Sequence, residues 1–318
     1  MDVSPLVPLD RVRQAAQAFA GRLHRTPTVP SRHLSHVAGA NVLLKLELFQ
    51  KTGSFKPRGV LTALDALPEA ERRKGVITLS AGNHAQAVAW AASASGIRST
   101  VVMPAHAVRF KVEATREYGG EVILTHDDLL ATTLEIQKRR GLTLVHPFDH
   151  PDIIAGQGTV ALELLEDVPA VDAVLVGCGG GGLLAGVATV VKALRPAAKV
   201  YGVEPSGAPG MRQSLDRGAP VRLDRVDTIA DGLAAPFIGA LTFAHARALV
   251  DDVFVVEDAE IVTAMKTLMQ RIKVLAEPAG AAALAPLLAG RVPLHAGATV
   301  AVVVSGGNVD LDRLRGLL

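Results

Sequence analysis

Short apolar segments alternate with longer segments of helical periodicity along most of the chain. Apolar residues three or four positions apart predict helices, whereas short runs of β-branched residues predict strands. Strands are expected at residues 42–48, 76–79, 99–103, 121–124, 143–145, 173–176, 199–203, 253–256 and 299–304. Helices are expected at residues 9–23, 56–67, 84–95, 109–118, 127–140, 158–166, 182–194, 241–250, 258–271, 277–288 and near the C-terminus. Residues 205–240 carry many Pro, Gly and Asp residues, which predict loops with one helix near residues 211–217.

Several of the predicted strands are apolar at every position. Residues 173–176 read Ala-Val-Leu-Val, and residues 300–304 read Val-Ala-Val-Val-Val. Strands of this kind are typical of parallel sheets that are covered by helices on both faces. The regular alternation of strand and helix therefore predicts an α/β fold of the doubly wound type, with mainly parallel sheets.

Composition and charge narrow the classes of function. The 318 residues include 33 Lys plus Arg against 31 Asp plus Glu, a balance that gives no support to nucleic-acid binding. The longest uncharged segment, residues 173–191, is interrupted by glycines and is not expected to span a membrane. Residues 1–9 lack the apolar core of a signal peptide, and the single cysteine, Cys178, excludes an intrachain disulfide. We therefore expect a cytoplasmic protein.

A basic segment lies between the first predicted strand and its helix. Lys51, Lys56 and Arg58 surround this junction, and Thr52 or Ser54 could cap the helix. The N-terminal end of a helix carries partial positive charge and favours anions, so cations are unusual there. They indicate either a solvated basic loop or an anionic partner.

A second junction consists almost entirely of glycine. Gly177-Cys178-Gly179-Gly180-Gly181-Gly182 links a buried strand to an apolar helix, where bare backbone N–H groups can hold a phosphate. The segment also matches Gly-x-Gly-x-x-Gly, and Glu204 ends the next strand, as in dinucleotide-binding sites. A nicotinamide-dependent oxidoreductase is thus an alternative, and close packing of helix on strand is a purely structural one. Cys178 is interpreted as a small buried side chain.

Two further junctions carry polar side chains. Ser80-Ala81-Gly82-Asn83-His84 and Ser305-Gly306-Gly307-Asn308 each follow an apolar strand. Their structural explanations are an N-cap and a turn. In a parallel sheet, however, such turns converge at the carboxyl ends of the strands, together with the turn that bears Lys56. A lysine in that position could form a Schiff base with a carbonyl cofactor whose phosphate rests on the glycines.

Four blocks of sequence resemble the signature blocks of the fold-type II pyridoxal-phosphate enzymes. They are Ser54-Phe55-Lys56-Pro57-Arg58-Gly59, Ser80-Ala81-Gly82-Asn83-His84-Ala85-Gln86, Gly179-Gly180-Gly181-Gly182-Leu183 and Ser305-Gly306-Gly307-Asn308. The subgroup they resemble contains the threonine/serine dehydratases and serine racemase. The likeness extends over nearly the whole chain, and further matches include Thr228–Gly232 and Glu277–Gly280. The resemblance implies a fold like that of the tryptophan synthase β subunit.

The resemblance also implies roles for these residues. Lys56 would carry pyridoxal 5'-phosphate and act as a base on the substrate α-carbon, with Phe55 beside the cofactor ring. Asn83 would bond the 3-hydroxyl oxygen of the cofactor, and Ser305 would face its pyridine nitrogen. A further set, Gly179, Gly180, Gly181 and Gly182, would hold the phosphate.

The substrate would bind beside the cofactor. Ser80, Gly82, Asn83 and His84 are the expected ligands of its carboxylate, with Ser80 as the candidate acid and base on the opposite face. The expected reaction is elimination of water from threonine or serine, to give a 2-oxo acid and ammonia. Racemisation of serine and dehydration of another hydroxy amino acid are the alternatives.

The remaining expectations concern domains, assembly and metal. The resemblance implies a large cofactor-binding domain (residues 1–70 and 151–318), a small domain over residues 71–150 with the cofactor site between them, and a homodimer. Several relatives hold a divalent cation, Mg or Ca, through three positions. Glu204 and Ala208 match two of these positions, but the third is Gly210, which argues against a bound cation here. The alternative interpretation of Glu204 is a solvated carboxylate at the end of a strand.

Overall fold

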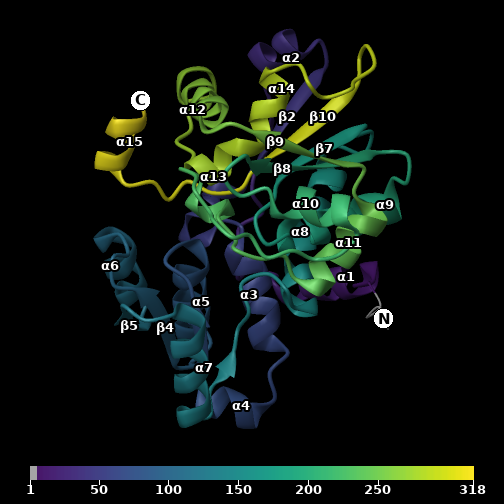
Figure 1. Cartoon of the computed structure of the whole chain (residues 1–318). Helices are drawn as coiled ribbons and strands as arrows, with labels where there is room; N and C mark the ends of the chain where they lie inside the picture. The colour runs from purple at the N-terminus through teal and green to yellow at the C-terminus, as the bar shows by residue number, and fades with distance from the viewer. Residues whose placement is uncertain (1–5) are drawn as a thin grey trace.

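Two separate β-sheets organise residues 6–318, the part of the chain that the computed structural model describes (Figure 1). Residues 1–5, which belong to the segment read as lacking a signal peptide, lie outside that range. All strand pairs are parallel except one at the edge of the larger sheet. The prediction of an α/β fold with mainly parallel sheets is confirmed.

The larger sheet has six strands in the order β1-β2-β10-β7-β8-β9. Their bounds are β1 Thr28–Pro30, β2 Asn41–Leu46, β7 Ala173–Gly177, β8 Lys199–Pro205, β9 Asp252–Val256 and β10 Thr299–Val304. β10 pairs along its whole length with β2, so the last strand lies beside one of the first. The turns that follow β2, β7 and β10 are therefore neighbours at one edge of the sheet.

The smaller sheet has four parallel strands in the order β5-β4-β3-β6. They are β3 Val76–Leu79, β4 Ser99–Pro104, β5 Glu121–Thr125 and β6 Thr143–Leu144. β3 lies in the middle of this sheet, and the turn after it carries Ser80 and Asn83.

Helices cover both sheets on both faces. Their bounds are α1 Leu9–Ala18, α2 Arg32–Ala38, α3 Lys56–Asp65, α4 Glu69–Lys74, α5 Asn83–Ala94, α6 Arg109–Glu117, α7 Leu129–Arg140, α8 Pro151–Asp167, α9 Gly182–Leu194, α10 Gly210–Arg217, α11 Ala240–Leu249, α12 Asp258–Thr267, α13 Pro278–Ala281, α14 Ala285–Leu288 and α15 Leu311–Leu317. Short helices are η1 Glu47–Phe49, η2 Lys51–Gly53, η3 Asp231–Leu233, η4 Leu268–Ile272 (a π-helix) and η5 Ala282–Leu284. In Figure 1, α4 to α7 surround the smaller sheet in the lower part of the view.

The hydrophobic pattern predicted most of these elements but not their exact extents. α2, α4 and β1 were not predicted, and α8 begins at Pro151, seven residues earlier than expected. The single helix expected at residues 277–288 is broken into α13, η5 and α14. Pro286 contributes to this break, because proline in a helix removes a backbone donor.

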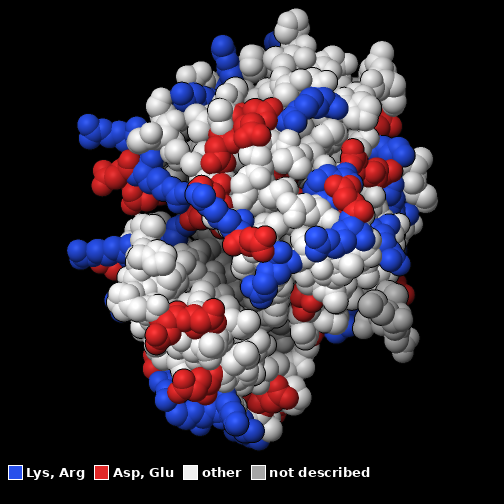
Figure 2. All heavy atoms as spheres, in the orientation of Figure 1, with Lys and Arg blue, Asp and Glu red and all other residues white. Residues whose placement is uncertain are grey.

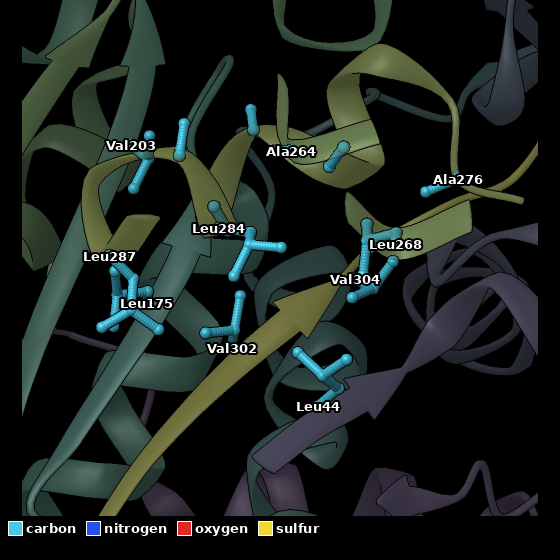
Figure 3. Packing of buried hydrophobic residues seen from close by; sticks show 14 of the residues in the cluster. Leu44, Leu175, Val203, Ala264, Leu268, Ala276, Leu284, Leu287, Val302 and Val304 are labelled. Atoms are coloured by element: carbon cyan, nitrogen blue, oxygen red, sulfur yellow. The ribbon is translucent and has the colours of Figure 1, made fainter. Parts of the chain in front are cut away.

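The core of the larger sheet has two sides. Leu44, Leu175 and Val302 point from three neighbouring strands toward Leu284 and Leu287 of the broken helix (Figure 3). On the other side, residues of β7, β8, β9 and β10 pack against α8, α9 and α11. The strands are thus buried on both faces, as their continuous apolar sequences predicted.

Glycines let three helices of the core approach closely. A Cβ atom at Gly156 of α8 would lie 2.3 Å from the carbonyl oxygen of Arg58 in α3. A Cβ at Gly186 of α9 would lie 2.4 Å from the carbonyl oxygen of Ile154 in α8. Side chains at these points would force the helices apart. This packing fixes α3, which begins at Lys56, relative to α9, which begins at the glycine turn.

The surface carries charges of both signs. Figure 2 shows acidic and basic side chains interspersed on the visible face, which is hollowed where the two sheet regions meet. Within residues 6–318, no helix has the length and apolar character needed to cross a membrane.

Candidate active site

A cavity of about 500 Å³ lies between the two sheets, at the carboxyl ends of their strands. Its walls combine the turns after β3, β7 and β10 with the start of α3. The residues predicted for catalysis, cofactor or substrate all line it: Phe55, Lys56, Ser80, Gly82, Asn83, His84, Gly179, Gly180, Gly181, Gly182 and Ser305. The structure therefore brings together residues that lie up to 250 positions apart in the sequence.

Lys56 occupies the first position of α3, inside the cavity. Its Nζ atom donates a hydrogen bond to the carbonyl oxygen of Pro147 at 3.0 Å and lies 5.2 Å from the centre of the Phe55 ring. Burial lowers the pKa of Lys56 to about 8, an effect that the carboxylate of Glu277 partly opposes. A large fraction of this amine is consequently neutral near pH 8, as a nucleophile or base must be.

The prediction that Thr52 or Ser54 caps α3 is wrong. Phe55 is the N-cap residue, and the hydroxyls of Thr52 and Ser54 are buried without a hydrogen-bond partner among residues 6–318. Thr52 instead adopts a left-handed conformation (φ 59°), and Ser54 pairs through its backbone with Gly306. The backbone at Thr52 and Ser54 thus joins two turns and does not cap α3.

Backbone hydrogen bonds join the lysine turn to the turn after β10. The amide of Phe55 donates to the carbonyl of Ser305 at 3.1 Å, and the amide of Gly307 donates to the carbonyl of Gly53 at 2.9 Å. Together with the Ser54–Gly306 bridge, these bonds set the position of Lys56 relative to Ser305.

Side-chain amides extend this junction to the turn after β3. Nδ2 of Asn308 donates to the carbonyl of Thr52 at 2.7 Å and to Oδ1 of Asn83 at 2.9 Å. Nδ2 of Asn83 in turn donates to Oε1 of Glu277. Burial raises the pKa of Glu277 to about 7, against the opposing effect of Lys111. Since an amide nitrogen has two hydrogens, Asn83 keeps one donor for a ligand.

The glycine turn forms part of the cavity wall. It leads into α9, whose first N–H groups have no acceptor within the helix. A Cβ at Gly180 would lie 2.3 Å from the ring of Phe148, and Gly181 has a φ of 90°. Only glycine meets both demands, and a turn of this form at the N-terminus of a helix suits an anion. The turn and the neighbouring lysine fit a phosphorylated aldehyde such as pyridoxal phosphate.

The turn after β3 is held in shape by its own polar side chains. Oγ of Ser80 accepts a hydrogen bond from the amide of Gly82 at 3.1 Å. His84 is buried, and its Nε2 lies 3.2 Å from the carbonyl oxygen of Val145, an arrangement that places the ring proton on Nε2. Burial, followed by the charge of Lys56, holds the pKa of His84 well below its usual range. The ring of His84 is thus a neutral anchor for the turn.

Sequence reasoning did not identify several other cavity residues. His146 and Phe148 follow the short strand β6. Phe237 lies in residues 205–240, for which the sequence predicted only loops and one helix. Lys111 of α6 reaches across the cavity to Asp231, with Nζ and Oδ2 2.6 Å apart. Two signals were available, because His146 directly follows a predicted strand and Asp231 lies in the matching segment Thr228–Gly232.

Glu204 does not lie in the cavity. Its carboxyl group is fully buried and accepts hydrogen bonds from the amides of Met211 at 2.7 Å and Arg212 at 2.9 Å, in the first turn of α10. The interpretation of Glu204 as a solvated carboxylate is therefore wrong. Its oxygens are occupied, which disfavours both a ribose contact and a cation. Across residues 6–318, no cluster of three or more His, Cys, Asp or Glu side chains is placed to hold a metal.

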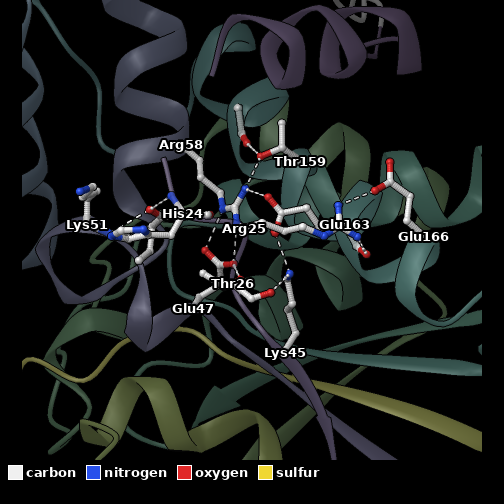
Figure 4. A network of polar contacts seen from close by, with 12 residues as sticks. His24, Arg25, Thr26, Lys45, Glu47, Lys51, Arg58, Thr159, Glu163 and Glu166 are labelled. Carbon is white, nitrogen blue, oxygen red and sulfur yellow. Dashed lines mark hydrogen bonds and ion pairs between the residues drawn. The ribbon is translucent and has the colours of Figure 1, made fainter. Parts of the chain in front are cut away.

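A buried ionic network supports α3 two residues after Lys56. The guanidinium of Arg58 bonds both oxygens of Glu47 at 2.8 Å and Glu163 at 2.7 Å and 2.9 Å (Figure 4). Lys45 bonds the same Glu163 at 2.7 Å. Arg58 is 1% exposed, so this network holds α3 to β2 and α8 in the interior.

Comparison with known proteins identifies the family. Residues 20–306 match the family model described as "Pyridoxal-phosphate dependent enzyme". The chain belongs to the pyridoxal-phosphate-dependent enzymes. Two relatives are the L-threonine ammonia-lyase of Thermotoga maritima (42% identity; 97% of this chain, 77% of the relative) and the L-threo-3-hydroxyaspartate ammonia-lyase of a Pseudomonas species (43%; 96% and 97%). The structure of maize serine racemase superimposes with a TM-score of 0.94 at 41% identity, covering 98% of this chain and 97% of that one.

Membership of this family decides against the main alternative function that the sequence left open, a nicotinamide-dependent oxidoreductase. The nicotinamide interpretation required Glu204 to be available to a ribose hydroxyl, but its oxygens bind the backbone of α10. The resemblance to the fold-type II pyridoxal-phosphate enzymes is confirmed, as is the fold class.

Proposed function

We propose that this chain is a pyridoxal-phosphate-dependent ammonia-lyase that dehydrates a small hydroxy amino acid, with L-threonine and L-serine as its substrates. The observation that carries the proposal is Lys56: a buried amine with a lowered pKa in the same cavity as a glycine turn that suits a phosphate. Relatives with more than 40% identity over at least 96% of this chain bear ammonia-lyase names. Pyridoxal phosphate supplies an acceptor for the electron pair that remains when the α-carbon loses its proton.

The residue roles in this proposal are those that the family resemblance implies, and they are supported by the presence of all these residues in one cavity. Lys56 would carry the cofactor, and its amine, once released, would remove the α-proton of the substrate. The amides of Gly179 to Gly182 would hold the phosphate, with Phe55 beside the ring and Ser305 near the ring nitrogen. Asn83 would donate to the 3-hydroxyl oxygen with the hydrogen that Glu277 does not use.

The turn after β3 binds the substrate. Ser80, Gly82, Asn83 and His84 surround its carboxylate, chiefly through N–H groups at the start of α5. With the carboxylate and amine fixed, the α-proton that Lys56 removes and the β-hydroxyl would leave together as water. The enamine that is released adds water and yields a 2-oxo acid and ammonia.

Replacement of the lysine tests this proposal. Lys56→Ala should remove the yellow absorbance that borohydride fixes to the wild-type protein and reduce release of 2-oxo acid below detection. Lys51→Ala is the matched control, because this neighbouring lysine does not line the cavity. Lys56→Ala protein that keeps a borohydride-trapped chromophore would refute the assignment.

Racemisation of serine is a second candidate. It is favoured by the close superposition on maize serine racemase and by the position of the Ser80 hydroxyl in the cavity. Chiral analysis of residual serine, measured beside the release of pyruvate, separates the two reactions. Formation of D-serine faster than pyruvate would favour the racemase.

The same proposal covers organisation. We infer a large domain from residues 1–70 and 151–318 and a small domain from residues 71–150, joined as a homodimer in the cytoplasm. A divalent cation is not part of the proposal, because Glu204 bonds the backbone of α10 and Gly210 offers no carboxylate. Sedimentation of the purified protein tests the dimer.

A further inference from the structure

The loop at residues 145–150 leads from β6 in the smaller sheet to α8, which packs on the larger one. Two of its groups meet the proposed cofactor site. The carbonyl oxygen of Pro147 accepts the hydrogen bond from Nζ of Lys56, at 3.0 Å. The ring of Phe148 fills the space that a Cβ at Gly180 would occupy. A loop lacks the regular hydrogen bonds of a strand or helix, so its position depends on individual contacts.

The first of these contacts lies within the loop. Nδ1 of His146 accepts hydrogen bonds from the amides of Phe148 at 3.2 Å and Asp149 at 2.8 Å. Burial lowers the pKa of His146 to about 4, so this nitrogen stays free to accept at neutral pH. All three residues belong to the same loop. Their hydrogen bonds therefore fix the shape of the loop but not its position against the larger sheet.

A second contact joins the loop to α11. Oδ1 of Asp149 accepts hydrogen bonds from the amides of Leu241 and Thr242, each at 3.0 Å. They are the second and third residues of α11, whose first N–H groups have no acceptor within the helix. The N-cap residue of α11 is Gly239, which has no side chain to accept them. Asp149 therefore supplies, from 92 residues away, the cap that α11 lacks in its own sequence.

The carboxyl group of Asp149 lies directly against the start of this helix. A Cβ at Gly239 would overlap the Asp149 carboxyl group, so glycine is what admits it. A carboxylate in this position also meets the partial positive charge of the helix N-terminus. The contact between the loop and α11 is thus favoured by packing, hydrogen bonding and charge together.

The start of α11 also borders the glycine turn. A Cβ at Gly181 would lie 3.0 Å from Cβ of Thr242. Farther along α11, Phe243 and Ala246 belong to the same hydrophobic cluster as the buried residues of α9, which begins at that turn. The two amides that hold Asp149 therefore belong to an element whose position relative to the glycine turn is fixed.

We propose that Asp149 is a positioning residue for the cofactor site: through its two hydrogen bonds to α11, it holds the loop after β6 against Lys56 and the glycine turn. The inference rests on the proposed function, in which Lys56 carries the cofactor. Asp149 is not among the residues that line the cavity, so it acts through the loop and not by touching cofactor or substrate.

Three variants test the proposal. Asp149→Ala removes the acceptor, whereas Asp149→Asn keeps one oxygen that can accept from both amides. Ser31→Ala is the matched control, because Oγ of Ser31 caps α2 by accepting from the amide of Leu34 and does not line the cavity. Each protein is compared by its Tm and by an absorbance titration with pyridoxal phosphate.

The titration should separate these variants. Loss of a helix cap changes an equilibrium constant by a factor of roughly 3 to 30. Asp149→Ala should raise the Kd for pyridoxal phosphate by about that factor, because the loop no longer holds its place beside the lysine and the glycine turn. Asp149→Asn and Ser31→Ala should stay within about twofold of the wild type.

A second measurement needs no cofactor. The rate at which acetic anhydride modifies Lys56 in the cofactor-free wild type should have a midpoint near the pKa of about 8. In Asp149→Ala, water reaches the amine when the loop moves, and the midpoint should shift toward the value of about 10.4 for an exposed lysine. A purely structural role for Asp149 would lower the Tm without moving this midpoint.

The outcomes that overturn the inference are distinct from those that overturn the proposed function. Wild-type values of both Kd and midpoint in Asp149→Ala, equal changes in Ser31→Ala, or no recovery in Asp149→Asn would overturn the inference. Should Asp149→Ala fail to fold, Leu241→Pro removes one of the two donors in the first helical turn, which tolerates proline, and the same measurements apply. A wild type that binds the cofactor but releases no ammonia overturns only the proposed lyase activity, because neither measurement requires turnover.

Discussion

The Nζ atom of Lys56 lies 3.0 Å from the carbonyl oxygen of Pro147, to which it donates a hydrogen bond. A carbonyl oxygen carries no formal charge, so this bond does not compensate the ammonium form for the loss of water. The carboxyl group that raises the pKa of Lys56 is Glu277. It is itself buried, and burial raises its own pKa to about 7. The environment of Lys56 therefore favours the neutral amine over the ammonium ion.

The first prediction concerns the titration of this amine. In protein freed of its cofactor, the rate at which acetic anhydride modifies Lys56 should rise with pH to a plateau, with a midpoint near the pKa of about 8. A lysine amide in the same solution should give a midpoint of about 10.4. Mass spectrometry of the peptide that contains Lys56 provides the measurement. Coincident midpoints for the peptide and the amide would show that burial does not depress the pKa.

The second prediction concerns stability and Glu277. Burial raises its pKa from 4.5 to about 7, so between these values the folded protein keeps a proton that the unfolded chain releases. The free energy of unfolding of the cofactor-free protein should therefore fall as pH rises through this window, by about 2–3 kcal/mol. Glu277→Gln removes the titrating group, and its free energy of unfolding should lack this part of the decrease. Urea denaturation near about pH 5 and about pH 7 compares the two proteins; parallel pH profiles would contradict the prediction.

The third prediction concerns the ionic network below the active site. Arg58→Met leaves Glu47 and Glu163 facing each other in the interior with fewer partners (Figure 4). Removal of one partner of a buried pair costs about 3–5 kcal/mol. Arg25→Met is the control, since Arg25 pairs with Glu166 and Asp167 at the surface, where the cost is about 1 kcal/mol or less. Equal losses of unfolding free energy in the two variants would show that burial of the network adds nothing.

Most of the strands and the glycine turn could be predicted from sequence because their causes are local. A strand that is apolar at every position indicates burial on both faces of the sheet. Successive glycines indicate that the backbone lies close to a neighbouring group. The turns after β2, β7 and β10 could be placed together because the turns of a parallel sheet share one edge. The turn after β3 belongs to the smaller sheet, and only the family resemblance placed it with the other three. Every residue of the four blocks for which the sequence predicted a role in catalysis or binding lines the same cavity.

Other features could not be predicted because their partners are distant in sequence. Pro147 lies 91 residues from Lys56, and Glu277 lies 194 residues from Asn83. The cap predicted at Thr52 or Ser54 failed for the same reason: the backbone of Ser54 pairs with Gly306, more than 250 residues away. The close approach of Gly280 to the turn after β10 is equally non-local, since a Cβ at Gly280 would lie 2.1 Å from the carbonyl oxygen of Gly306. The interpretation of Glu204 as a solvated carboxylate failed because the burial of this residue depends on the position of α10.

The last prediction tests the glycine turn through its contact with Phe148. A methyl group at position 180 would lie 2.3 Å from Cγ and Cδ1 of Phe148, whose ring is packed against His146 and Phe237. The turn must then shift away from the ring, at a cost of about 1–3 kcal/mol that falls on cofactor binding. Gly180→Ala should thus raise the Kd for pyridoxal phosphate about 10- to 100-fold in an absorbance titration.

A second substitution shows whether the clash is the cause. Phe148→Leu in the Gly180→Ala background removes ring atoms that the new methyl group meets, and should recover part of the lost affinity. Gly316→Ala is the control for the mutation itself, because a Cβ there meets no atom within 4 Å. If Gly180→Ala binds the cofactor as tightly as Gly316→Ala does, the phosphate does not depend on the close approach of this turn to Phe148. If Phe148→Leu restores nothing, the cost of the methyl group arises in the backbone of the turn rather than at the ring.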